Sequence, residues 1–196
     1  MLQHFIWIFL FFILLYNQMS KKDNAKDPEI NLLLIAQAND VKNIDRFFKQ
    51  DDENEIKNQV NSSDPDGVRP IMYASFYGNL MFVQLLIQAG AEVNCIEKRK
   101  WTPLMYAVRY GRLDVTRELV LNHAKLEMKN DEGHTALMIA AKYGQIDILN
   151  FIMNHGADPD QKDHEGHTAM QLAQDKGYKI IVETLKERMN ERKKYK

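Results

Sequence analysis

The sequence contains one cysteine and carries almost no net charge, and each shortage excludes a class of protein. Because Cys95 is the only cysteine, no disulfide can form within the chain, which favours a reducing compartment, the cytoplasm. The formal net charge of −1 leaves no overall basic field, so nucleic acid is not an expected partner. The length of 196 residues and a hydrophobic content of 45% suit one globular domain.

Motifs that carry catalysis or hold cofactors are also missing. The sequence has no nucleophile–base pair within a recognisable motif, no phosphate-binding glycine loop and no paired catalytic carboxylates. Among its six histidines, His164 and His167 are close in sequence and His134 precedes His167 by 33 residues. A metal site there would need more ligands than the surrounding sequence offers. We therefore expect neither an enzyme nor a bound cofactor or metal.

The few glycines are placed with a fixed period, and they mark copies of one motif. The clearest copy runs from Trp101 to Leu113, and it returns at intervals of 33 residues. The glycines form three columns: Gly78, Gly111, Gly144 and Gly177; Gly67, Gly133 and Gly166; Gly90 and Gly156. Lys100 and His123 fill gaps in the second and third columns. Since glycine adopts positive φ without strain, each column predicts one special turn that recurs in every copy.

An alanine column accompanies the glycines and predicts a close approach of helices. Its members are Ala74, Ala107, Ala140 and Ala173. The apolar residues of the segments that follow recur at helical spacing, as in the run from Leu80 to Leu86. A single copy cannot cover such a stripe, whereas stacked copies can. The sequence thus predicts an array of stacked helical units.

The period, the Thr-Pro-Leu entry at 102–104 and the Gly-Ala-Asp-type exit at 155–160 resemble the ankyrin repeat. The resemblance implies an all-α solenoid of stacked helix–turn–helix units with β-hairpin loops. It covers residues 29–188, with repeats expected at 29–60, 64–96, 97–129, 130–162 and 163–188. The repeat pattern places a histidine after Thr-Pro-Leu, but this chain has other residues there: Met72, Met105, Met138 and Gln171. We expect soft apolar packing to replace the polar tie between repeats.

Residues 1–19 differ from the rest, because residues 5–16 are an unbroken apolar run. The run is short for a membrane-spanning helix, which needs about 20 apolar residues. It lacks the basic start and the cleavage site of a secretory signal. Two interpretations remain open: an N-terminal anchor that leaves the repeats in the cytosol, or a true translation start at Met19. Residues 20–28 are expected to form a polar linker.

The first and last repeats depart from the pattern. A helix is expected to open at Asp27-Pro28-Glu29, and the surplus residues Asp51 to Glu55 are expected to form an acidic loop. Arg69 replaces a capping threonine, and Lys100 occupies a glycine position, so both are predicted weak points. The fifth unit ends in a charged helix that suits a terminal cap. The basic tail, 189–196, is either a solvated helix end or a contact for an acidic partner or lipid.

The resemblance implies a protein-binding module that uses hairpin tips and the concave face of the first helices. Mapped onto this sequence, the candidate protein-binding residues are Phe76, Tyr77, Lys98, Arg99, Trp101, Arg109, Tyr110, His134, Lys142 and Tyr143. Tyrosine, tryptophan and arginine dominate protein interfaces, and the basic residues suggest an acidic or amphipathic segment of the partner. Tyr77, Tyr110 and Tyr143, each directly before a glycine, form a tyrosine column. Alternatively, this tyrosine column only packs locally. We expect a monomeric adaptor or scaffold; the alternative is a structural subunit tethered to a membrane by residues 1–19.

Asn94 resembles the asparagine that some ankyrin proteins present to an asparaginyl hydroxylase. It follows Val93 and lies eight residues after Leu86. The alternative interpretation is an ordinary turn asparagine.

Overall fold

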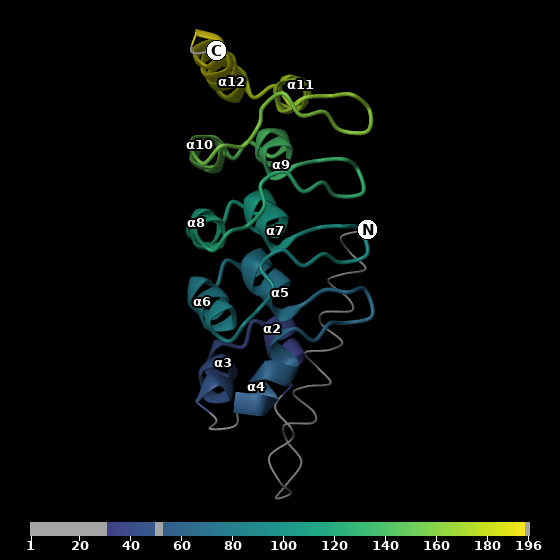
Figure 1. Cartoon of the computed structure of the whole chain (residues 1–196), viewed down its shortest axis with the longest axis vertical. Coiled ribbons are helices and arrows are strands. Elements are labelled where there is room, and N and C mark those ends of the chain that lie inside the picture. The colour runs from purple at the N-terminus through teal and green to yellow at the C-terminus, as the bar shows by residue number, and fades with distance from the viewer. Residues whose placement is uncertain (1–30, 50–52, 195–196) are drawn as a thin grey trace, which may run out of the picture.

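A computed structural model describes residues 31–49 and 53–194, and within them the chain forms pairs of antiparallel helices stacked into an array (Figure 1). The first helices of the pairs form an inner row: α2 (Leu32–Ala38), α5 (Pro70–Tyr77), α7 (Pro103–Arg109), α9 (Ala136–Lys142) and α11 (Ala169–Asp175). The second helices form an outer row: α3 (Val41–Phe48), α6 (Leu80–Gln88), α8 (Leu113–Leu121), α10 (Ile146–Asn154) and α12 (Lys179–Lys194). The all-α solenoid predicted from the sequence is confirmed.

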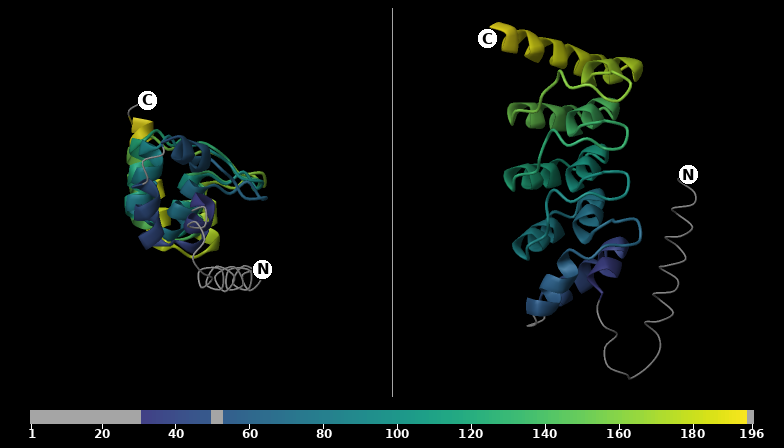
Figure 2. Two further views of the ribbon diagram at one scale, coloured as in Figure 1. Left: turned by 90° about the horizontal axis from the view of Figure 1, so that it is seen from below. Right: turned by 45° about the vertical axis from the view of Figure 1, so that its right-hand side comes forward.

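The loops that join successive pairs all project to the same side of the array (Figure 2). They turn back on themselves as hairpins do, but no strand forms within the described ranges. Adjacent loops share single backbone hydrogen bonds, such as Lys98 N–H to Asp66 O at 3.0 Å and Asp131 N–H to Arg99 O at 3.0 Å. The loops therefore follow a hairpin-like path that is held by single hydrogen bonds rather than by a β-ladder.

Helix starts and stops follow the predicted chemistry. Thr102, Thr135 and Thr168 accept hydrogen bonds from the third backbone N–H of their helices, whereas Arg69 makes no such bond. All nine glycines have positive φ. Lys100 and His123, which fill the gaps in the glycine columns, also have positive φ, at 59° and 65°. The turn is thus imposed by the array even where the residue disfavours it.

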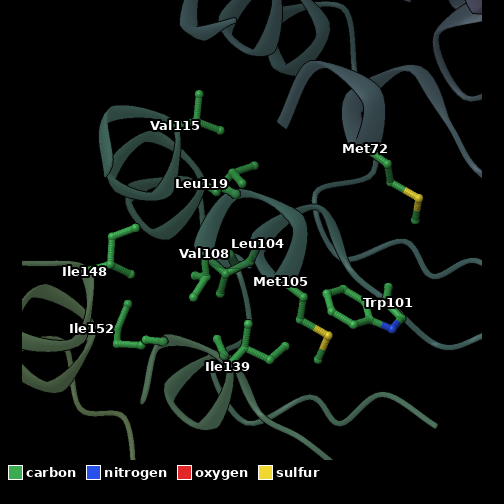
Figure 3. Packing of buried hydrophobic residues seen from close by; sticks show 14 of the residues in the cluster. Met72, Trp101, Leu104, Met105, Val108, Val115, Leu119, Ile139, Ile148 and Ile152 are labelled. Carbon is green, nitrogen blue, oxygen red and sulfur yellow. The ribbon is translucent and has the colours of Figure 1, made fainter. Parts of the chain in front are cut away.

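The core is continuous from the first repeat to the last. All four residues of the alanine column are fully buried. Met72, Met105 and Met138 are 1% exposed, so apolar packing does occupy the position predicted to lack a histidine tie. Figure 3 shows Met105 beside Trp101, with Leu104 and Val108 of the same helix and Ile139 of α9 on the other side of Met105. Each repeat therefore completes its core with side chains of the next.

One boundary at the N-terminal side differs from the sequence-based expectation, and another lies outside the described residues. Residues 53–55 were expected in an acidic loop, but they begin an additional helix, α4 (Glu53–Val60). Ile56 and Val60 lie one turn apart and pack against the core, and Gln59 accepts a hydrogen bond from Leu32 N–H at 2.6 Å. The expected helix start at residues 27–29 lies outside the described residues; α2 begins after Asn31, whose side chain caps it.

The C-terminal repeat ends the array with a polar surface. Gln171 and Gln174 are exposed on α11, whereas their counterparts in α9, Met138 and Ala141, are buried. This polar end face agrees with the cap expected for the last unit. Among residues 31–49 and 53–194, no helix has the length and apolar character needed to cross a bilayer. The apolar segment 1–19 lies outside that part of the chain.

Candidate protein-binding surface

Each projecting loop is held by one side chain that the sequence analysis missed. Asp64 accepts hydrogen bonds from the N–H groups of the residues two and four positions later. Its counterparts at the 33-residue period do the same: Glu97, Asn130 and Asp163. The column of short acceptors before Gly67, Gly133 and Gly166 could have revealed this role. Such bonds fix the loop backbone, so residues at the tips occupy defined positions.

Basic residues at the loop tips are paired with acids of neighbouring loops. Lys98 Nζ lies 3.0 Å from Asp66 Oδ1, and Arg99 Nε lies 3.3 Å from Asp131 Oδ2. Both cations remain exposed, and the pairs are weak individually. The pairing raises the pKa of Arg99 through its hydrogen bond to Asp131. Their charges are therefore partly neutralised within the array.

Arg109 forms the centre of an aromatic cluster on the inner-helix row. Its guanidinium carbon lies 5.2 Å from the ring centroid of Trp101, 5.6 Å from that of Tyr110 and 5.0 Å from that of Tyr143. These residues come from two successive repeats, because α7 and α9 pack side by side. Tyr110 and Tyr143 are 40% and 37% exposed. The stacked repeats thus bring an arginine and two accessible tyrosines together.

The cluster continues into the preceding repeat through Phe76. Its ring centroid lies 4.4 Å from that of Tyr110 in an edge-on contact and 4.8 Å from that of Tyr77. Tyr77 donates its hydroxyl to Gln37 O at 2.8 Å, and burial raises its pKa. Tyr77 therefore packs locally, as one interpretation of the tyrosine column held. We define the inner-helix surface by its members: Phe76, Tyr77, Arg109, Tyr110, Lys142 and Tyr143.

Two of the candidate contact residues are buried rather than presented. Trp101 and His134 are each only 5% exposed. The Trp101 ring packs 5.4 Å from Tyr106 and beneath Arg109, and its indole N–H has no acceptor among the described residues. Trp101 and His134 therefore offer little accessible area in the folded array, and their part in partner binding stays a prediction. Substituting Trp101 would test folding more than binding.

His134 lies in a charged setting that links the last two loops. Its Nδ1 is 3.1 Å from Glu132 Oε2 and its Nε2 is 3.4 Å from Asp163 Oδ2. Burial is the main cause that lowers the pKa of His134, Lys142 lowers it further, and the two carboxylates oppose them. Burial raises the pKa of Asp163, but hydrogen bonds from His167 and Glu165 outweigh it, and the net pKa is lowered. Lys142 pairs with Glu132 at 3.1 Å.

Asn94 ties its repeat to the next one. Its amide donates to His123 O at 3.0 Å, and its side-chain oxygen accepts from Lys125 N–H at 2.7 Å. Asn61, one period earlier, makes the same two bonds, to Gly90 O and Glu92 N–H. Asparagine side chains therefore link successive repeats by hydrogen bonds at this position. Any enzyme that modified Asn94 would first have to break both bonds.

The described residues can be compared with the requirements of metal binding and of nucleophilic chemistry. They contain no group of three or more histidine, cysteine, aspartate or glutamate side chains placed to hold a metal ion. Cys95 is buried, and burial raises the pKa of its thiol to about 11, so it is a poor nucleophile.

Comparison with known proteins agrees with the architecture. The family model described as Ankyrin repeats (3 copies) matches residues 32–130, 71–163 and 115–195. No enzyme family was detected, and no curated protein matched the chain. The matches span almost the whole described part, which is also the part that stacks as helix pairs with projecting loops. Sequence period, fold and family model coincide over the same residues, and the chain belongs to the ankyrin-repeat family.

Proposed function

We propose that the protein is a non-catalytic adaptor or scaffold that binds a partner protein through its inner-helix surface and loop tips. Ankyrin repeats are typically protein–protein interaction modules. The absence of a matching enzyme family supports a role in binding rather than catalysis. A buried free Cys95 is compatible with action in the cytoplasm, where we place the protein as a monomer.

One observation carries this proposal: Tyr110 and Tyr143 remain more than a third exposed while their rings lie close to the Arg109 guanidinium. Arginine and tyrosine are the residue types that contribute most to protein interfaces. Here Arg109 ends α7, and Tyr110 and Tyr143 are the residues that follow α7 and α9, two helices fixed in the core. Tyrosine has few rotatable bonds, so little side-chain entropy is lost on binding. A surface with these properties favours a protein partner over a small ligand.

The proposal is tested by affinity purification of the full chain from its native cell, followed by mass spectrometry. The double variant Tyr110→Ala/Tyr143→Ala should lose the partners that the unaltered protein recovers. Leu121→Ala is the control, because Leu121 is 67% exposed and lies on the outer helix α8. Equal recovery by all three proteins would overturn the assignment of the inner-helix surface.

The second candidate function is a membrane-tethered structural subunit. The apolar run within residues 1–19 favours it. Recovery of the native protein with the membrane fraction after alkaline extraction would support a tether, and recovery in the supernatant would exclude it. Either outcome leaves the adaptor proposal to its own test.

A further inference from the structure

Four basic side chains at the loop tips and near the inner helices have a partner within the described part of the protein, and Arg109 does not. Lys98 and Arg99 pair with acids of adjacent loops, and Lys142 pairs with Glu132. Arg112 donates to the carbonyl of Phe76 at 3.1 Å. Arg109 alone among these five has neither an ion pair nor a hydrogen bond within residues 31–49 and 53–194.

The surroundings of Arg109 hold its guanidinium in place without using its hydrogen-bonding capacity. Three aromatic rings lie within 5.6 Å of the guanidinium carbon, and ring faces contact a cation without accepting N–H bonds in its plane. The side chain is half-buried, so its loss of water is not repaid by a protein acceptor. The N–H groups of the Arg109 guanidinium are thus held among the rings without an acceptor from the described residues.

We propose that Arg109 receives the carboxylate of an aspartate or glutamate side chain of the partner, flanked by Tyr110 and Tyr143. This inference rests on the proposed protein-binding function and adds the chemistry of the bound segment. A carboxylate matches the planar fork of arginine with two parallel hydrogen bonds. The neighbouring rings would pack on the apolar residues beside that acid, so the recognised segment combines one acid with adjacent apolar side chains.

Charge balance favours a side-chain carboxylate over other anions. A phosphorylated residue carries close to two charges and is usually bound by a cluster of arginines. Here Lys142 of the adjacent helix α9 is paired with Glu132 at 3.1 Å, and Arg112 donates to the carbonyl of Phe76, so no second arginine of the described residues is left without an acceptor beside Arg109. A C-terminal carboxylate is typically captured by backbone N–H groups, whereas the residues around Arg109 offer ring faces. The single guanidinium of Arg109 therefore favours a ligand group with one negative charge, a side-chain carboxylate.

The test uses the full chain and a displayed peptide library in which acidic residues occur at every position. The tightest binder is synthesised with a fluorescent label, and its acids are replaced one at a time by their amides, Asp→Asn or Glu→Gln. Further peptides carry a phosphoserine in place of the critical acid or an amidated C-terminus. Arg109→Gln removes the charge, and Arg109→Lys keeps the charge but removes the fork. Arg117→Lys is the matched control, because Arg117 also stacks on a ring, Phe151, but on the outer row.

The proposal requires three results together. One acid-to-amide change weakens binding by about tenfold or more, Arg109→Gln and Arg109→Lys weaken the unaltered peptide to a similar extent, and neither adds to the effect of the amide. Arg117→Lys and the amidated C-terminus change nothing, and urea midpoints confirm that each variant folds. Preference for phosphoserine would reassign the ligand and overturn the proposal, as would a library without any carboxylate-dependent binder.

The outcomes also separate this inference from the function on which it rests. If Tyr110→Ala/Tyr143→Ala abolishes binding while both Arg109 variants bind normally, the carboxylate assignment fails and the interaction surface stands. If the tyrosine variant also binds normally, both fail.

Discussion

Lys100 adopts a left-handed backbone conformation, which residues other than glycine disfavour. Its φ is 59°, whereas its counterparts at the same loop position are glycines with φ near 85°. A non-glycine residue in this conformation costs about 1–2 kcal/mol, and glycine recovers part of that at some entropic cost. We expect Lys100→Gly to raise the free energy of unfolding by about 1 kcal/mol, measured from the urea midpoint. The control is Lys98→Gly in the same loop, which should not stabilise the protein.

His134 should make stability depend on pH near neutrality. Its pKa in the folded state is lowered from the ordinary 6.5, chiefly by burial, so the unfolded chain binds the proton more tightly. The stabilising contribution of neutral His134 is therefore complete above pH 6.5 and is lost as pH falls from there through the lowered pKa. Asp163 acts in the same direction at lower pH, because its pKa is lowered from 3.8.

The measurement is the urea midpoint between neutral and mildly acidic pH. His134→Gln should reduce the loss of stability on acidification relative to the parent protein. A His134→Gln profile as steep as that of the parent would contradict the assignment.

At the scale of helices, the alanine column sets how closely α9 can approach its neighbours. Ala140 is fully buried, and α7, α10 and α11 all pack against α9. We expect Ala140→Leu to destabilise the protein by about 1–3 kcal/mol or more, because added methylenes force helices apart. Gln174→Leu, on the exposed end face of α11, should have a far smaller effect. Comparable urea midpoints for the two variants would invalidate the alignment of the repeats.

Helix positions were predictable because the period repeats them, and α4 was not because it occurs once. Its first residues looked like an acidic loop, yet Glu53 and Glu55 in a first helical turn face the positive end of the helix dipole. The apolar signal consisted of only Ile56 and Val60, too short a pattern to distinguish a helix from a loop. Helix α4 is fixed by a tertiary contact, the bond from Leu32 N–H to Gln59, which sequence spacing does not reveal.

The sequence predicted which residues of the candidate surface lie side by side, but not how far each side chain is exposed to solvent. The repeat alignment correctly brought Arg109, Tyr110 and Tyr143 together. It could not show that Trp101 turns beneath Arg109, because a column position fixes the backbone and leaves the rotamer to the neighbours. The pairs Lys98–Asp66 and Arg99–Asp131 did leave a signal, since each joins opposite charges 32 residues apart.

For the whole molecule, the core extends from Leu32 to Leu185 without interruption among the described residues. A chain that starts at Met19 should therefore unfold at the same urea concentration as the full chain, since every residue of this core is retained. Circular dichroism during urea titration of both proteins provides the measurement. A midpoint shifted by more than the experimental error would show that residues 1–18 contribute to folding.

The side-chain ties of Asn61 and Asn94 reach only the adjacent repeat, and this gives the array a particular mechanical character. A load applied between its two ends passes through the junctions in series, and no described tie of this kind spans two of them. Pulling should therefore extend the molecule in steps, with each repeat yielding as a link, rather than in one global rupture. Below the force of the first step we expect the stack to bend and recover elastically, and repeated stretching and relaxation of single molecules would measure this.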